Sequence, residues 1–93
     1  MEKQTSQSLI RVLIVEDDPE FATMLRVILT EAHVGQFDPA IVRSLEGAVT
    51  QLKKSEFDIL LLDLFLPDSE GHNTFLKILD QIPDTPIVVV TGL

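Results

Sequence analysis

Three short, almost wholly apolar runs constrain the fold of this chain more than any other feature of its sequence. They are Ile10–Val15 (IRVLIV), Ile59–Leu62 (ILLL) and residues 87–90 (IVVV). Apolar residues at successive positions, rather than only at alternate ones, are typical of strands covered on both faces, as in parallel sheets. We therefore expect the three runs to be strands of one buried sheet.

The stretches between the runs have the period of amphipathic helices. Asp18 and Pro19 supply an N-cap and a proline at the first helical position, and the apolar residues behind them recur at i, i+4, i+7 and i+8. These residues are Phe21, Leu25, Ile28 and Leu29. This pattern predicts a helix over residues 19–32.

Two further helices are predicted in the same way. Ser44 can cap a helix whose apolar residues are Leu45, Val49 and Leu52. A third helix follows Gly71 and stops before Pro83, with Phe75, Ile78 and Leu79 on one face.

Phe37–Val42 is a weaker strand candidate, because Pro39 has no N–H for a central ladder. We place this strand at an edge of the sheet. Strands and helices then alternate along the whole chain, and parallel strands joined by right-handed crossovers build a doubly wound open α/β sheet.

Composition limits the chain to one small domain. It has 93 residues, of which 45% are hydrophobic. We assign residues 1–9 to a polar N-terminal extension and residues 10–93 to the domain. The sequence has no cysteine, no apolar signal-peptide core and no apolar run long enough to span a bilayer, so we expect a cytoplasmic protein with no membrane contact.

The charge of the chain argues against nucleic acid as a direct partner. Seven basic and fifteen acidic residues give a net charge of -8, which repels a phosphate backbone. The chain could still be one part of a protein whose other part binds DNA.

Acidic residues follow two of the predicted strands directly. Glu16, Asp17 and Asp18 follow the first, and Asp63 follows the third. Ligands of open α/β sheets bind outside the carboxyl ends of the strands, so these carboxylates converge if the two strands are neighbours. Clustered carboxylates suit Mg²⁺, and a carboxylate beside Mg²⁺ can attack a phosphoryl group to form an aspartyl-phosphate.

The order and spacing of these motifs resemble the receiver domains of two-component response regulators, the CheY-like family. The matching residues are Glu16-Asp17 after the first strand, Asp63 with Pro67 and Gly71 four and eight positions later, and Thr91-Gly92 after the fourth strand. The resemblance implies a flavodoxin-like fold with strand order 2-1-3-4-5. It also implies a signalling domain rather than an enzyme, with at most self-phosphorylation from small donors and self-dephosphorylation.

The resemblance assigns a role to each site residue. Asp63 is the expected phosphoacceptor, Asp17 a direct Mg²⁺ ligand, and Glu16 an acidic partner acting through water. The backbone carbonyl of Phe65 is a further expected ligand, and Thr91 the switch hydroxyl, with Gly92 leaving room for the phosphoryl group. We assign Asp18 to capping of the first helix, and Asp68, Ser69 and Glu70 to turn formation.

The sequence departs from the family pattern at its C-terminal end. The family continues for a helix, a fifth strand and a fifth helix, and its fifth strand carries a lysine that contacts the phosphoryl group. No lysine of this chain occupies that position. We therefore expect a C-terminally incomplete receiver whose fourth strand is an open edge. It is either a fragment of a longer protein or a form that covers this edge as a homodimer or by exchange of elements.

Three functions follow from these observations. The first is a receiver that takes a phosphoryl group onto Asp63 from a sensor histidine kinase or phosphotransfer protein and switches an effector domain or protein. The second is a phosphorylation-silent truncated receiver that acts in binding or dimerisation. The third, which we disfavour, is a Mg²⁺-dependent phosphohydrolase, because haloacid-dehalogenase-like enzymes have an aspartate where this chain has Phe65. A dinucleotide site is disfavoured too, since no G-x-G-x-x-G follows the first strand.

Overall fold

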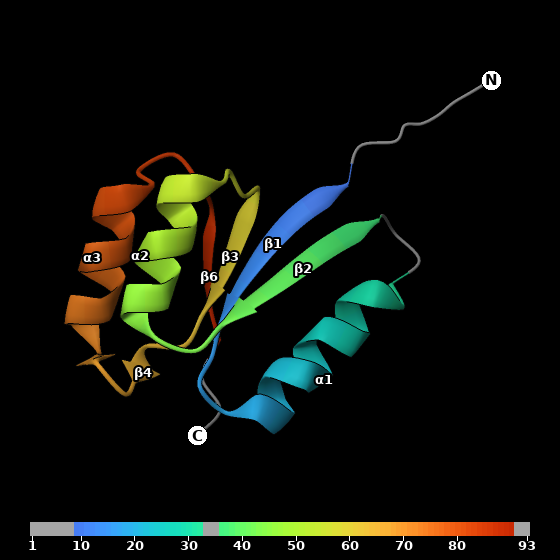
Figure 1. Ribbon diagram of the computed structural model, residues 1–93, viewed down its shortest axis with the longest axis horizontal. Helices are drawn as coiled ribbons and strands as arrows, with labels where there is room; N and C mark the ends of the chain where they lie inside the picture. The colour runs from blue at the N-terminus through green and yellow to red at the C-terminus, as the bar shows by residue number, and fades with distance from the viewer. Residues whose placement is uncertain (1–8, 33–35, 91–93) are drawn as a thin grey trace.

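The computed structural model describes residues 9–32 and 36–90, and Figure 1 shows how they are arranged. In chain order the elements are β1 (Ile10–Val15), α1 (Pro19–Thr30), β2 (Phe37–Val42), α2 (Leu45–Lys54), β3 (Ile59–Leu62), β4 (Phe65–Leu66), β5 (Ser69–Glu70), α3 (His72–Gln81) and β6 (Ile87–Val89). The predicted alternation of strands and helices is confirmed. The short β4–β5 pair is an addition to it.

The main sheet has four parallel strands in the order β2-β1-β3-β6. Pairing runs from Ile10↔Phe37 to Val15↔Val42 on one side of β1, and Val15 also pairs with Leu62 of β3. β2 lies at an edge, where the missing N–H of Pro39 breaks no central ladder. The sheet is therefore the predicted doubly wound one, with β1 and β3 as neighbours at its centre.

Helices cover both faces of the sheet. α1 packs on one face, and α2 and α3 pack side by side on the other (Figure 1). Because successive side chains of a strand point to opposite faces, β1 contributes to both cores. Val12 and Ile14 pack with Ala22 of α1, whereas Leu13 and Val15 pack with Ala48 of α2 and Ile78 of α3. Each fully buried aliphatic side chain contributes about 1.5–3 kcal/mol to folding.

The predicted caps of the first two helices are present. Asp18 accepts a hydrogen bond from the Glu20 N–H at 3.0 Å, and Ser44 accepts one from the Gly47 N–H at 3.0 Å. α1 ends at Thr30 and not at residue 32 as predicted, because Glu31 leaves the helical backbone region with φ −98° and ψ 3°. The apolar periodicity contains no signal for that exit.

A small hairpin occupies the segment that the sequence predicted as a turn. Phe65 pairs with Glu70 and Leu66 with Ser69, antiparallel, and Pro67 and Asp68 connect them. Strands of two residues are too short to produce an alternating pattern, so the hairpin has no sequence signature.

β6 is the last strand of the sheet on the side of β3, in agreement with the predicted open edge for the described residues. Val88 and Val89 lie 43% and 45% exposed there. Among residues 9–32 and 36–90, no helix has the length and apolar character needed to cross a membrane.

Candidate functional site

The acidic residues meet because β1 and β3 pair in register and end at the same edge of the sheet. The Asp63 N–H donates to the Val15 carbonyl at 3.0 Å, and the Glu16 N–H donates to the Val42 carbonyl of β2 at 3.0 Å. These bonds extend both ladders by one residue beyond the strands. Glu16 and Asp63 are therefore held by the sheet itself rather than by a loose loop.

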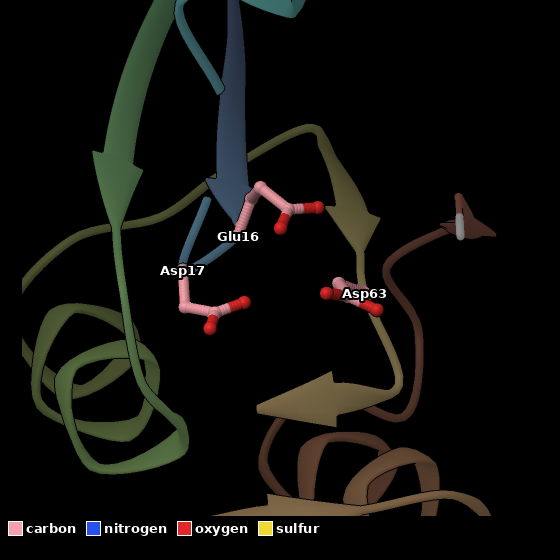
Figure 2. A group of neighbouring side chains, drawn as sticks. All are labelled: Glu16, Asp17 and Asp63. Atoms are coloured by element: carbon pink, nitrogen blue, oxygen red, sulfur yellow. The ribbon is translucent and has the colours of Figure 1, made fainter. Parts of the chain in front are cut away.

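Figure 2 shows the carboxylates of Glu16, Asp17 and Asp63 directed into the space between the ends of β1 and β3. One oxygen from each of the three carboxylates lies within 4.8 Å of the other two. We call these three residues the acidic cluster. The predicted convergence is confirmed for the residues that the structure describes.

Glu16 is the most buried member, with 3% of its surface exposed. Its Oε2 accepts a hydrogen bond from the Asp18 N–H at 3.1 Å, whereas its Oε1 is buried and has no hydrogen-bond partner in the part of the chain that the structure describes. Burial is the main reason why the pKa of Glu16 rises from 4.5 to about 7; the neighbouring Asp63 and Asp17 carboxyl groups contribute to this rise, and the bond from the Asp18 N–H opposes it. Glu16 is thus a desolvated acid, and within residues 9–32 and 36–90 no basic side chain forms an ion pair with it.

Asp63 is also buried, with 6% of its surface exposed. Its Oδ1 accepts a hydrogen bond from the Phe65 N–H at 3.1 Å. The backbone bond to Val15 and this side-chain bond together restrict the orientation of the carboxylate. Asp17 is the exposed member and closes the cluster on the solvent side.

The donor set of the acidic cluster fits a hard divalent cation. Three carboxylates supply oxygen ligands only, and a buried Oε1 without a partner is costly unless an ion or a water satisfies it. A cation would also remove the repulsion among three neighbouring negative groups. The residues present therefore fit Mg²⁺, with one side of the cluster open to solvent at Asp17.

Of the remaining predicted site residues, one lies next to the acidic cluster and the others lie outside the described part of the chain. Phe65 lies two positions after Asp63 and donates its N–H to Asp63 Oδ1 at 3.1 Å, while the role of its carbonyl as a metal ligand stays a prediction. Thr91 and Gly92 lie outside the described residues. Val90, the last described residue, donates its N–H to the Leu62 carbonyl at 2.9 Å, so the chain follows β3 as far as the residue before Asp63.

Two residues beside the site were missed by the sequence analysis. Asp68, expected only to form a turn, accepts hydrogen bonds from the N–H groups of Leu45 and Glu46 at the start of α2. Thr74 is fully buried and bonds to the Leu64 carbonyl and to Ser69. No local pattern could have indicated the role of Asp68, since its partners lie 22 and 23 positions away. The partners of Thr74 are 5 and 10 positions away, but they come together only through the fold of the hairpin.

A family model described as "Response regulator receiver domain" matches residues 12–93. Among curated proteins, the DNA-binding response regulator MtrA of Mycolicibacterium smegmatis is 35% identical over 82 residues, a match that covers 88% of this chain and 34% of MtrA. The response regulator protein PilR of Pseudomonas aeruginosa is 30% identical and also matches 88% of this chain, but only 18% of PilR. The chain therefore spans about a third or less of the length of these relatives.

Solved structures agree with this match. A response regulator receiver domain protein described as CheY-like, from Methanospirillum hungatei JF-1, superposes with a TM-score of 0.81 at 28% identity. The alignment covers 92% of this chain and 66% of that one. A sensor protein from Polaromonas sp. JS666 superposes with a TM-score of 0.78 at 32% identity, over 88% of this chain and 65% of that one.

Proposed function

This chain belongs to the response regulator receiver domain family, and on that premise we propose that it accepts a phosphoryl group on Asp63 with Mg²⁺ bound at the acidic cluster. The observation that carries the proposal is the convergence of Asp63 with Glu16 and Asp17 beside a buried carboxylate oxygen that no described residue bonds to. The proposed donor is a sensor histidine kinase or a phosphotransfer protein.

Each residue of the site has a defined part in this proposal. Oδ1 of Asp63 is engaged by the Phe65 N–H, so Oδ2 is the oxygen that forms the new bond to phosphorus while the bond from phosphorus to the donor breaks. Asp17 and Asp63 would hold the metal directly, the Phe65 carbonyl would complete the ligand set, and Glu16 would act through water. When bound, Mg²⁺ would neutralise negative charge on the oxygens of the phosphoryl group during its transfer.

The output of the domain is part of the same proposal. An aspartyl-phosphate shifts the equilibrium between two conformations, which an effector domain or protein detects. MtrA is named as DNA-binding, so an effector that binds DNA elsewhere in a longer protein is one form of such an output. Thr91 is proposed to bond to the phosphoryl group, and the cytoplasm is the proposed location.

The first test is intact mass spectrometry before and after incubation with Mg²⁺ and acetyl phosphate. We expect a single phosphoryl adduct on the wild-type protein and none on Asp63→Asn, which keeps the shape of the side chain but lacks the nucleophilic oxygen. The exposed Asp80→Asn is a matched control that keeps the adduct. No adduct on the wild-type protein would contradict the proposed phosphoacceptor role.

A second candidate function is a phosphorylation-silent module that acts in binding or dimerisation. The exposed valines of β6 at an open edge of the sheet favour it, because unpaired strand edges recruit partners. Mg²⁺ titration separates the two candidates. Binding that is weakened by Asp17→Asn supports the phosphoacceptor, whereas no Mg²⁺ binding to the wild-type protein supports the silent module.

A further inference from the structure

The β4–β5 hairpin lies between the phosphoacceptor and α3, and it carries a residue that contacts the site. Its first strand contains Phe65, whose N–H donates to Oδ1 of Asp63 at 3.1 Å. A hairpin with two residues in each strand has little stability of its own. The position of Phe65 beside Asp63 must therefore depend on what holds the hairpin in place.

The base of the hairpin is held by α3. Thr74 is fully buried, and its hydroxyl lies 3.0 Å from the Leu64 carbonyl and 2.8 Å from the hydroxyl of Ser69. The Gly71 N–H donates to the same Leu64 carbonyl at 2.7 Å. Leu66 adds a buried side chain in the core beneath α2 and α3. These contacts fix the two ends of the hairpin where it joins β3 and α3.

The tip of the hairpin is held by α2 through Asp68. Oδ1 of Asp68 lies 2.8 Å from the Leu45 nitrogen, and Oδ2 lies 3.0 Å from the Glu46 nitrogen. These are the first two N–H groups of α2, which have no partner inside the helix. The bonds from Leu45 and Glu46 lower the pKa of Asp68, which is consistent with an ionised carboxylate at the positive end of a helix.

Capping alone does not account for Asp68, because α2 has a local cap already. Ser44 accepts a hydrogen bond from the Gly47 N–H at 3.0 Å, as helix N-caps commonly do. The two caps satisfy different N–H groups, and only Asp68 belongs to the hairpin. Asp68 therefore joins α2 to the segment that carries Phe65, whereas Ser44 stabilises α2 without contacting that segment.

We propose that Asp68 is a positioning residue for the acidic cluster. By tying the hairpin tip to α2 it fixes Phe65, and through it the Asp63 carboxylate, in the orientation that binds the metal and meets the phosphoryl donor. Coupling between two sites is reciprocal, so occupation of the acidic cluster changes the environment of the first N–H groups of α2. This inference rests on the proposed function, because it assigns a positioning residue to that same site.

The test compares Asp68→Ala with Ser44→Ala, which removes the other cap of the same helix. Mg²⁺ is titrated into each protein while the amide resonances of Leu45 and Glu46 are followed by NMR. In the wild-type protein and in Ser44→Ala, we expect both resonances to shift as the acidic cluster fills. In Asp68→Ala we expect the shifts to disappear and the Mg²⁺ dissociation constant to rise about fivefold or more, the usual range of such coupling.

Asp68→Asn provides the conservative variant. It keeps one acceptor oxygen and so one of the two bonds to α2, and we expect an intermediate dissociation constant. Asp68 is exposed, so the substitutions leave no cavity. If Asp68→Ala does not fold, Asp68→Asn is compared with Ser44→Ala instead. A higher Mg²⁺ dissociation constant for Asp68→Asn than for Ser44→Ala then supports the positioning role of Asp68, and equal constants contradict it.

The outcomes separate this inference from the proposed function. If the wild-type protein binds Mg²⁺ but Asp68→Ala and Ser44→Ala bind it equally well, Asp68 is only a cap and the positioning role is wrong. The same conclusion follows if the Leu45 and Glu46 resonances do not respond in the wild-type protein. If the wild-type protein binds no Mg²⁺, the proposed function and this inference both fail.

Discussion

At the scale of single residues, Glu16 has the least favourable environment of the acidic cluster. It is nearly inaccessible to solvent, one of its oxygens has no hydrogen-bond partner among the described residues, and two further carboxyl groups lie beside it. A protein interior tolerates such a group only where the neutral form is available or a cation compensates the charge. The raised pKa of Glu16 makes the neutral form available in the absence of metal, and its position supports the proposed metal site.

The pH dependence of stability tests this explanation for Glu16. Its pKa in the folded protein, about 7, lies above the ordinary value of 4.5, so its contribution to stability is fully present below about pH 4.5 and is lost as the pH rises through about 7. In metal-free buffer we expect Glu16→Gln to reduce the loss of stability over this window. The measurement is urea unfolding at several pH values, with the exposed Glu20→Gln as the matched control. Parallel pH profiles for Glu16→Gln and the wild-type protein would contradict the assignment.

Gly71 is constrained by its backbone rather than by its surroundings. Its φ of +62° and ψ of −138° are rarely adopted by residues with a side chain, and an added Cβ would meet no heavy atom within 4 Å. We expect Gly71→Ala to lower the free energy of unfolding by about 1–3 kcal/mol through strain alone. Urea unfolding measures this loss. An unchanged midpoint for Gly71→Ala would show that the segment adjusts without strain.

At the scale of elements, α3 is stabilised by packing rather than by capping. Its N-cap, Gly71, makes no side-chain bond, and its last turn has no basic residue. Its buried side chains, Thr74 and Ile78, instead attach it to the hairpin and to the core. The stability of α3 should therefore depend strongly on which face of the helix is changed.

A pair of alanine substitutions on α3 tests this dependence. Ile78 is fully buried, so Ile78→Ala should lower the free energy of unfolding by about 2–5 kcal/mol, the usual cost of the lost contacts and the cavity. Leu76, two positions earlier, is exposed, and Leu76→Ala should change the free energy of unfolding by less than about 0.5 kcal/mol. Chemical unfolding of both variants gives the comparison. Equal losses would contradict the packing of α3 through its buried face.

At the scale of the whole molecule, both faces of the sheet are incompletely covered at β6 within the described residues. Val88 pairs with Leu61, which belongs to the core beneath α1, and Val89 pairs with Leu62, which belongs to the core beneath α2 and α3. Both valines are nonetheless more than two-fifths exposed. Within the described residues, β6 thus presents apolar side chains on both faces at an open edge.

In a preparation limited to residues 1–93, an exposed apolar edge of this kind favours self-association. We expect light scattering to report an apparent mass that rises with protein concentration, and we expect Val89→Lys to reduce the rise because a lysine on an edge strand opposes pairing with a second copy. Val27→Lys, on the exposed surface of α1, is the control and should have no such effect. A monomer at every concentration would exclude this edge as an interface.

Much of the fold could be predicted because its signals are local. The apolar runs identify β1 and β3 to the residue, and Pro39 places β2 at an edge. The predicted end of α1 was wrong by two residues. The helix ends at Thr30 because the backbone of Glu31 is no longer helical, and apolar periodicity does not encode this change.

Local sequence patterns were sufficient to predict the order of the elements and the members of the acidic cluster, because apolar runs, caps and the spacing of Asp63, Pro67 and Gly71 are properties of short stretches of chain. Two features became visible only in the folded chain: Glu16 has a buried oxygen that no described residue bonds to, and Asp68 joins the hairpin to α2. The physical reason is that burial and long-range hydrogen bonds depend on the residues that folding brings together, and those residues are far apart along the chain.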